Sequence, residues 1–249
     1  MRPLVLLSND DGYTSRGIRA VREALLTVAD VVLVAPETEQ SASSHSLSLH
    51  RPLRLRTAEP GVFALDGTPA DCVYVALHSD GKVLPRKPDL IVSGINRGLN
   101  LGQDAFYSGT VAAAREGALR GIPALASSAE VGGDLDAIAA LTTKLAMSLL
   151  EARRGVAALL SLNVPKVWNG KVQAARLGAR LYEEIVYFRT DPRGREYLWL
   201  GGPGVSHKDD PGSDTDAFDR GFATLTPLDL DLTLREGLAL ADSLGQTIG

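Results

Sequence analysis

Two adjacent carboxylates, Asp10 and Asp11, follow the first apolar run of the chain, in the motif Asn-Asp-Asp-Gly at 9–12. Two like charges side by side repel each other, so the pKa of one carboxyl would rise unless a cation lay between them. A site with only oxygen ligands favours Mg²⁺, Mn²⁺ or Ca²⁺ over zinc or copper. Asn, Asp and Gly are also frequent in ordinary turns that precede a helix. Taken alone, the motif leaves a metal site and a structural turn equally open.

A second polar and glycine-rich segment, at 93–102, reads Ser-Gly-Ile-Asn-Arg-Gly-Leu-Asn-Leu-Gly. Its glycines let the backbone approach a ligand closely, and Asn96 offers a neutral oxygen ligand. Arg97 could clamp a phosphate, although an exposed loop arginine is the commoner case. The segment is not a G-x-G-x-x-G fingerprint, and the chain has no G-x-x-x-x-G-K-[ST] motif. The sequence therefore argues against a dinucleotide-binding fingerprint and a P-loop NTPase.

A third segment, Tyr-Ser-Gly-Thr-Val at 107–111, precedes a predicted helix. Ser108 or Thr110 would cap that helix, and the free N–H groups at its start, together with the positive end of the helix dipole, form an anion site. Capping by itself also explains Ser and Thr at these positions. The segment gains weight as a phosphate site because it follows the glycine-rich segment closely.

A polar loop at 39–46 contains Ser41 and His45, a pair that could act as nucleophile and base. The chain has no G-x-S-x-G elbow, so we do not expect a serine hydrolase. A D-x-D-x-T match at 229–233 lies near the C-terminus, whereas this motif opens a domain in phosphatases that use an aspartyl phosphate, so we reject that chemistry. We expect surface or loop positions for the four histidines, which lack metal-ligand spacing: His45, His50, His78 and His207.

Short apolar runs alternate with helical patterns through the first two thirds of the chain. Runs that are apolar on both faces are typical of strands in a covered parallel sheet, and they lie at 4–7, 31–35, 90–92, 124–126 and 157–162. The apolar spacing in the first intervening segment is helical, and Thr68 followed by Pro69 marks a helix start. Helices are predicted at 16–29, from 69 onward, at 109–120 and at 134–153. The alternation predicts an α/β fold with a doubly wound, mostly parallel sheet.

The pattern changes after about residue 165, so we expect a catalytic core at 1–165 and a C-terminal segment at 166–249. Five aromatic residues fall in a predicted hairpin at 181–200, and an isolated hairpin cannot bury them. They must either cover the parent domain or pack against a second subunit, and we expect the second, because large exposed apolar patches usually mark a subunit contact. The elements predicted here are strands at 172–177, 181–188 and 197–200, a turn at 191–194, a loop at 201–219 and a strand at 222–225. From Pro227 onward the chain is expected to end in a C-terminal helix.

The composition is that of an ordinary globular protein, with 26 basic and 30 acidic residues and a formal net charge of −4. An acidic balance argues against duplex nucleic acid as a partner, because counterion-release binding needs a basic surface. The one cysteine, Cys72, excludes an internal disulfide framework and a cysteine-rich zinc site. No apolar run approaches the roughly 18 residues of a membrane span, and no signal peptide is legible, so a cytoplasmic protein without a membrane partner is expected.

Five motifs, in order and at fitting intervals, resemble one family, that of the stationary-phase survival protein SurE, a metal-dependent 5′-nucleotidase. They are N-D-D-G at 9–12, Q-S-x-x-x-H-S at 40–46, G-T-P-A-D-C at 67–72, S-G-I-N-R-G-x-N-x-G at 93–102 and Y-S-G-T-V-A-A-A-R-E-G at 107–117. Residues 215–217 and 221–228 also look like the family's C-terminal signature. The resemblance implies a Rossmann-like core and a C-terminal hairpin exchanged between subunits of a homodimer or homotetramer.

The resemblance also implies a site. One divalent ion per subunit, Mg²⁺ or Mn²⁺, would be held by Asp10, Asp11, Ser41 and Asn96. Phosphate would be bound by residues from three of the motifs: Asn9, Asn96, Arg97, Ser108, Gly109 and Thr110. The catalytic roles would fall to Asp10, Asp11 and Asn96, with a carboxylate accepting the proton of the attacking water. One departure is Ala42, where many members have Gly; alanine resists positive φ.

The expected activity is hydrolysis of nucleoside 5′-monophosphates to nucleoside and phosphate, with 3′-monophosphates and short polyphosphate left open as further substrates. The alternative is a non-catalytic nucleotide-sensing module that uses the same crevice. Metal-dependent release of phosphate from AMP or GMP would separate the two classes.

Overall fold

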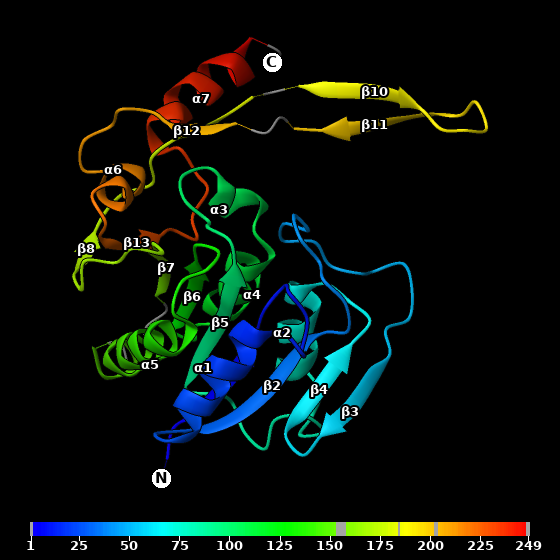
Figure 1. Ribbon diagram of the computed structural model, residues 1–249, viewed down its shortest axis with the longest axis vertical. Helices are drawn as coiled ribbons and strands as arrows, with labels where there is room; N and C mark the ends of the chain where they lie inside the picture. Colours follow the sequence, from blue (N-terminus) through cyan, green and yellow to red (C-terminus); the bar gives the residue numbers. More distant parts are fainter. Residues whose placement is uncertain (1, 153–157, 184, 202–203, 248–249) are drawn as a thin grey trace.

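The chain folds around one central sheet of nine strands in the order β3-β4-β2-β1-β5-β6-β7-β13-β8 (Figure 1). The computed structural model describes residues 2–152, 158–183, 185–201 and 204–247. The five central strands pair in parallel, which confirms the predicted α/β fold with a mostly parallel sheet. They are β1 (Leu4–Ser8), β2 (Asp30–Pro36), β5 (Leu90–Arg97), β6 (Ala124–Ala129) and β7 (Leu159–Val164).

Helices cover both faces of the sheet because each central strand is apolar on both sides. In β1, Val5 and Leu7 pack into one buried cluster, whereas Leu4 and Leu6 pack into the other. The first cluster includes side chains of α1 (Arg16–Leu26) and α5 (Leu135–Ala152). The second includes side chains of α2 (Pro69–Leu77) and α4 (Gly109–Leu119). This is the arrangement of a doubly wound sheet (Figure 1).

The start of α2 follows the prediction from sequence. Thr68 accepts a hydrogen bond from the backbone N–H of Asp71, the Asp71 carboxylate accepts one from the backbone N–H of Thr68, and Pro69 is the first helical residue. This reciprocal capping box satisfies two N–H groups that the helix itself leaves free. The predicted helix at 16–29 ends earlier, at Leu26. Residue 153 of the predicted helix at 134–153 and residue 157 of the predicted strand at 157–162 lie outside the described residues.

Two strands were missing from the sequence prediction. β3 (Leu55–Glu59) and β4 (Val62–Leu65) form an antiparallel pair, and β4 extends the sheet in parallel beyond β2. β3 lies at the sheet edge and is largely exposed, so it lacks the continuous apolar run by which the central strands were recognised.

The C-terminal segment corrects several predictions. The strand predicted at 181–188 is two strands with different partners: β9 (Arg180–Tyr182) pairs with β12 (Val205–His207), and β10 (Val186–Thr190) pairs with β11 (Glu196–Leu200). The predicted loop at 201–219 contains β12 and also α6 (Asp214–Asp219). Gly and Asp in this stretch suggested a loop, but Ser213 caps α6 by accepting from the N–H of Asp216.

The chain returns to the sheet after α6. β13 (Ala223–Leu228) pairs antiparallel with β7 and parallel with the short β8 (Val172–Ala174), so the strand predicted at 222–225 extends to Leu228. β8 pairs only with residues 223–225, so Pro227, which has no N–H, has a strand partner on one side alone. The final helix, α7 (Leu238–Gln246), follows a short 3₁₀ turn, Arg235–Gly237.

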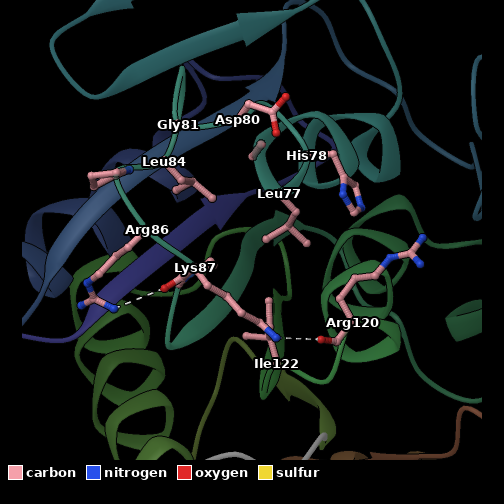
Figure 2. Close-up of a pocket in the computed structure, with 12 residues that line it drawn as sticks. Leu77, His78, Asp80, Gly81, Leu84, Arg86, Lys87, Arg120 and Ile122 are labelled. Carbon is pink, nitrogen blue, oxygen red and sulfur yellow. Dashed lines mark hydrogen bonds between the residues drawn. The ribbon is translucent and has the colours of Figure 1, made fainter.

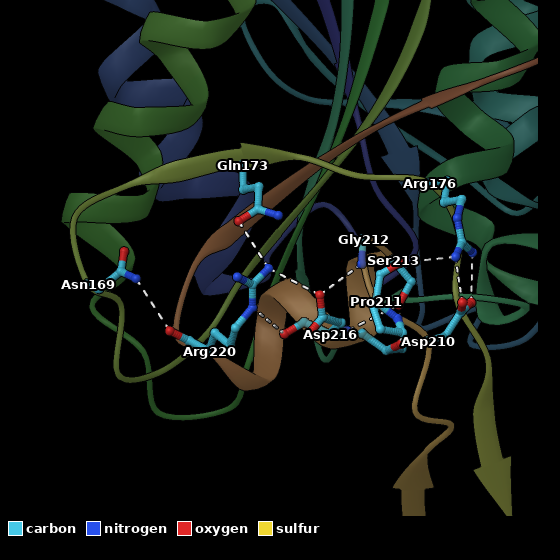
Figure 3. A network of polar contacts seen from close by, with 10 residues as sticks. Asn169, Gln173, Arg176, Asp210, Pro211, Gly212, Ser213, Asp216 and Arg220 are labelled. Atoms are coloured by element: carbon cyan, nitrogen blue, oxygen red, sulfur yellow. Dashed lines mark hydrogen bonds and ion pairs between the residues drawn. The ribbon is translucent and has the colours of Figure 1, made fainter.

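Ion pairs and hydrogen bonds tie α6 to β8 and to the segments beside it (Figure 3). Arg176 pairs with Asp210, and its guanidinium also donates to the carbonyl of Pro211. Arg220 pairs with Asp216 at 3.1 Å and donates to Gln173 at 3.3 Å. Short-range charge pairs of this kind are worth little singly, but together they fix the orientation of α6 against the sheet edge.

The hairpin of β10 and β11 extends away from the body of the molecule (Figure 1). All ten of its strand residues are exposed, among them Phe188 at 63% and Trp199 at 66%. Among the described residues, no helix has both the length and the apolar character needed to cross a membrane.

Candidate functional site

The carboxyl ends of the parallel strands meet at one edge of the sheet, and the predicted site residues gather there. Asp10 and Asp11 follow β1, Ser41 lies in the loop after β2, and Asn96 and Arg97 end β5. A cavity of about 700 Å³ at this edge is lined by Asp10, Ser41, Asn96 and Arg97, together with Ser108 of the segment before α4. Crevices at this edge are where open α/β sheets bind their ligands.

Asp10 is almost fully buried, and it accepts a hydrogen bond from the hydroxyl of Thr110. Burial raises the pKa of Asp10 to about 6, against the opposing effect of the Thr110 hydrogen bond; the neighbouring charge of Asp11 raises it further. The start of α4 lies directly against this carboxylate, since a Cβ added to Gly109 would be 2.9 Å from the Cβ of Asp10. Only glycine permits this approach.

Asp11 is half-buried, and its carboxylate accepts a hydrogen bond from the backbone N–H of Arg97 at 2.9 Å. Burial raises the pKa of Asp11, and the charge of Glu39 adds to the effect. The side chain of Arg97 is exposed, whereas the half-buried Asn96 donates to the carbonyl of Gly98 at 3.0 Å. The loop after β1 is therefore joined to the end of β5 through Asp11.

Asn9 lies beneath the cavity and is not among its lining residues. Its side chain is fully buried, and its amide nitrogen donates to the carbonyl of Gly12 at 3.0 Å and to the hydroxyl of Ser15 at 2.9 Å. The amide oxygen of Asn9 is buried without a hydrogen-bond partner among the described residues. Asn9 thus shapes the turn that carries Asp10 and Asp11.

The segment before α4 uses its two hydroxyls differently. Ser108 is the helix cap and accepts from the backbone N–H of Val111 at 3.1 Å, while also lining the cavity. Thr110 is fully buried, and its hydroxyl is taken up by Asp10. The structure therefore brings Ser108 to the cavity, whereas Gly109 is buried against Asp10 and the Thr110 hydroxyl is bound to Asp10.

Sequence reasoning missed the residues that hold the glycine-rich segment. The backbone N–H of Asn100 donates to the Asn163 side chain at 2.7 Å, and that of Gly102 donates to Asp214 at 2.9 Å. Asp214 also accepts from the N–H of Gly178 at 2.7 Å, and burial raises the pKa of this carboxyl. Asp214 belongs to the polar stretch that was read as a loop, so the only available signal was the Ser-Asp-Thr-Asp capping pattern at 213–216.

β9 supplies a wall of the cavity that the sequence did not indicate. Tyr182 lines the cavity, and both it and Arg180 donate to the carboxylate of Asp104, each at 2.5 Å. Burial and the hydrogen bond to Asp104 raise the pKa of Tyr182 to about 12, so its hydroxyl stays protonated. The C-terminal segment is thus part of the site through Tyr182.

The donor set fits a hard divalent cation. Asp10, Ser41 and Asn96 present carboxylate, hydroxyl and amide groups to one cavity, with Asp11 next to them. In the described part of the chain, no three His, Cys, Asp or Glu side chains lie close enough together to hold a metal ion by themselves. Any ion held here would therefore have mixed oxygen ligands, as Mg²⁺ and Mn²⁺ prefer.

His207 differs from the expectation of a surface or loop position, because it lies in β12, where it pairs with Asp219 at 2.8 Å. His45 lies in a loop as expected, but it pairs with the buried Glu116 at 2.9 Å, and its own side chain is only 19% exposed. Because 71 positions separate His45 from Glu116, local patterning cannot reveal this pair.

A smaller cavity, of about 400 Å³, lies next to the segments that enter β5 and β6 (Figure 2). Its basic side chains already have partners: Arg86 pairs with Asp89, Arg120 pairs with Glu116, and Lys87 donates to the carbonyl of Arg120 at 3.2 Å. This cavity brings together none of the motif residues, so the candidate site is the one at the carboxyl edge.

The chain has a doubly wound α/β fold, and carboxylate, hydroxyl and amide groups meet where its parallel strands end. This combination defines a class of α/β proteins suited to binding a metal and an anion. Within that class, the chain belongs to the SurE family: residues 5–184 match the family model described as "Survival protein SurE". The family predicted from the five motifs is therefore confirmed.

Similar proteins cover nearly the whole chain. A protein of Sorangium cellulosum named 5′-nucleotidase SurE is 62% identical over 245 residues, which is 96% of this chain and 95% of that protein. A protein of the same name from Geotalea daltonii is 44% identical over 243 residues, covering 95% and 96%. The crystal structure of the Sure protein from Aquifex aeolicus matches with a TM-score of 0.83 and 36% identity, covering 98% of this chain and 100% of that one.

Proposed function

We propose that the protein is a metal-dependent phosphomonoesterase that hydrolyses nucleoside 5′-monophosphates to nucleoside and phosphate. The observation that carries the proposal is the single cavity that gathers Asp10, Ser41, Asn96 and the start of α4. The names of the relatives at 62% and 44% identity support the substrate class. The alternative, a nucleotide-sensing module without turnover, uses the same cavity.

Asp10, Asp11, Ser41 and Asn96 would hold one divalent ion per subunit, Mg²⁺ or Mn²⁺. When bound, such an ion polarises the phosphoryl group and lowers the pKa of a bound water. The two adjacent carboxylates, whose pKa values burial raises, gain most from a cation because it removes their mutual repulsion. Thr110 holds the Asp10 carboxylate in place for this role.

The phosphate oxygens would lie against the start of α4. Ser108 and Gly109 begin this helix, whose free N–H groups and positive dipole end attract an anion. Asn96 adds an amide at the cavity wall, and the exposed Arg97 supplies a positive charge at its rim. Water would attack the phosphorus in line while the ester P–O bond to the nucleoside breaks. The proton of the water would pass to one of the two carboxylates, Asp10 or Asp11, and the leaving nucleoside oxygen would take up a proton to become a hydroxyl.

We propose 3′-monophosphates and short polyphosphate as further substrates, since a cavity of about 700 Å³ has room for more than one phosphate group. The test is phosphate release by the purified full chain from a panel of nucleoside 5′- and 3′-monophosphates and tripolyphosphate, with Mg²⁺, Mn²⁺ or Co²⁺. Asp10→Asn is the control for contaminating phosphatase. Nucleotide binding without metal-dependent phosphate release would contradict the proposal and favour the sensing module.

We further propose that the protein assembles as a homodimer or homotetramer through its C-terminal segment, 166–249. The support is the exposed hairpin, in which Phe188, Tyr197 and Trp199 are all more than 40% exposed. Exposed aromatic patches of this kind usually mark a protein interface.

A further inference from the structure

The loop that carries Ser41 adopts an unfavourable backbone conformation. Ala42 has φ 55° and Ser44 has φ 52°, in the left-handed region that residues other than glycine rarely occupy. A non-glycine residue stays in that region only when surrounding contacts enforce it. Two such residues flank Ser43, directly after Ser41, so the contacts of this loop determine where Ser41 lies.

Gln40, Ser44 and His45 make three of the contacts that hold the loop from outside, and the carbonyl of Ser46 makes another by accepting from the Thr68 hydroxyl. The backbone N–H of Gln40 donates to the carbonyl of Asp10 at 2.8 Å, just before Ser41. Ser44 donates from its N–H to the carbonyl of Tyr107 at 3.0 Å and from its hydroxyl to the carbonyl of Phe106 at 2.8 Å. The third contact joins the Nε2 atom of His45 to an oxygen of Glu116 at 2.9 Å.

The contact of His45 differs from the others because its partner is a buried charge. The side chain of Glu116 is only 2% exposed and lies in α4, the helix whose first turn borders the cavity. Burial raises the pKa of Glu116, but the hydrogen bonds with His45 and Arg120 outweigh this effect and lower it below its ordinary value. A charged carboxylate in the interior needs its partners, so it binds the imidazole firmly.

We propose that His45 is a positioning residue that fixes the Ser41 loop on α4 through Glu116, and thereby sets the Ser41 hydroxyl as a metal ligand. The inference rests on the proposed function, in which Ser41 is a ligand. Glu116 and the start of α4 belong to one rigid helix, so the pair holds Ser41 and the phosphate-binding end of α4 at a fixed spacing. His45 touches neither metal nor substrate in this role.

The test is Mn²⁺ binding by calorimetry to the full chain, without nucleotide, in wild type, His45→Ala, His45→Gln and Arg120→Gln. We expect His45→Ala to weaken Mn²⁺ binding about 10-fold, the usual cost of losing a group that orients a ligand. His45→Gln keeps an N–H donor and recovers part of the affinity. Arg120→Gln stays within about twofold, because Arg120 contacts Glu116 from the end of the same helix and, among the described residues, forms no hydrogen bond or ion pair with the loop.

A second measurement follows the loop without metal. Glu-C protease cuts after Glu37 and Glu39, and we expect faster cleavage there in metal-free His45→Ala than in wild type or Arg120→Gln. Wild-type Mn²⁺ affinity and wild-type cleavage in His45→Ala would overturn the inference, as would equal losses in Arg120→Gln. A third outcome is that wild type binds no Mn²⁺ while cleavage of the loop still depends on His45. That result would contradict the proposed function and would show that the His45 contact only stabilises the loop.

Discussion

The hydroxyl of Thr110 donates a hydrogen bond to the carboxylate of Asp10, although 100 positions separate the two residues in the chain. This contact joins the first turn of α4 to the loop after β1. Because Thr110 is fully buried, its hydroxyl bonds to Asp10 and not to solvent. The phosphate-binding end of the helix and the first carboxylate of the site are therefore positioned as one unit.

Thr110→Val keeps the branched shape of the side chain and removes the hydroxyl. We expect Mn²⁺ affinity or kcat/KM to fall by about 10- to 100-fold, as is usual when a ligand loses the hydrogen bond that orients it. Thr110→Ser, which keeps the hydroxyl, is the matched control. Calorimetry and phosphate release measure both quantities. A lower Tm with unchanged affinity and kcat/KM would show that Thr110 only stabilises the fold.

Asp10→Asn should abolish turnover while the metal-free variant remains at least as stable as wild type. The folded-state pKa of Asp10, about 6, is above the ordinary value of 3.8 for an aspartate. The folded protein therefore binds this proton more tightly than the unfolded chain, so rising pH between about 4 and 6 lowers the free energy of unfolding.

The Asp10→Asn substitution removes the free-energy cost of a charged carboxylate at this buried position. The amide oxygen can still accept a hydrogen bond from Thr110. Urea unfolding of metal-free protein at pH 4 and pH 7 is the measurement. We expect wild type to lose up to about 3 kcal/mol relative to Asp10→Asn between these values, from a pKa shift of about two units. An equal pH dependence in both proteins would contradict the burial penalty at Asp10.

Gly109→Ala should disrupt the site without adding or removing any polar group. The new Cβ would lie 2.9 Å from the Cβ of Asp10 and 2.9 Å from the hydroxyl of Ser43, so α4 and the loops must separate. Displacements of this order cost catalysis about 10²-fold. Gly245→Ala in α7 is the control, because no atom of the described residues outside its own helix backbone lies within 4 Å of the new Cβ, and it should leave kcat/KM unchanged. Wild-type kcat/KM in Gly109→Ala would contradict the close packing seen here.

Replacing residues 186–198 by a short glycine-containing turn should reduce the assembly state in sedimentation velocity. The hairpin strands bury none of their ten residues within the described chain, so the aromatic area they expose is available to a second subunit. Closed, self-complementary interfaces are the usual result when a chain pairs with its own copy. A trimmed protein that sediments like wild type would show that the hairpin is not the contact.

Local patterning was sufficient for the five central strands of the sheet. They are buried on both faces, so continuous apolar runs in the sequence identify them without reference to any partner. The start of α2 was equally legible, because the capping box of Thr68 and Asp71 involves residues three apart. The motifs that place Asp10, Ser41 and Asn96 after buried strands were also visible, since parallel strands bring their carboxyl ends to one edge.

Elements whose stability depends on distant partners escaped prediction. The stretch read as one strand at 181–188 divides because Tyr182 pairs with β12 and Val186 pairs with β11, and neither pairing has a local signature. Exposed or short strands such as β3 and β12 lack an apolar run, because they bury little side-chain area.

The sequence by itself determined which side chains are available for chemistry and which strands carry them, since residue type and apolar periodicity are properties of neighbouring positions. Only the tertiary structure decided what each of them contacts. It turns Thr110 to Asp10, sets His45 against Glu116 and uses Asp214 to hold Gly102. The physical reason is that a buried polar group must find a partner wherever the fold supplies one, and that partner lies at no fixed distance along the chain.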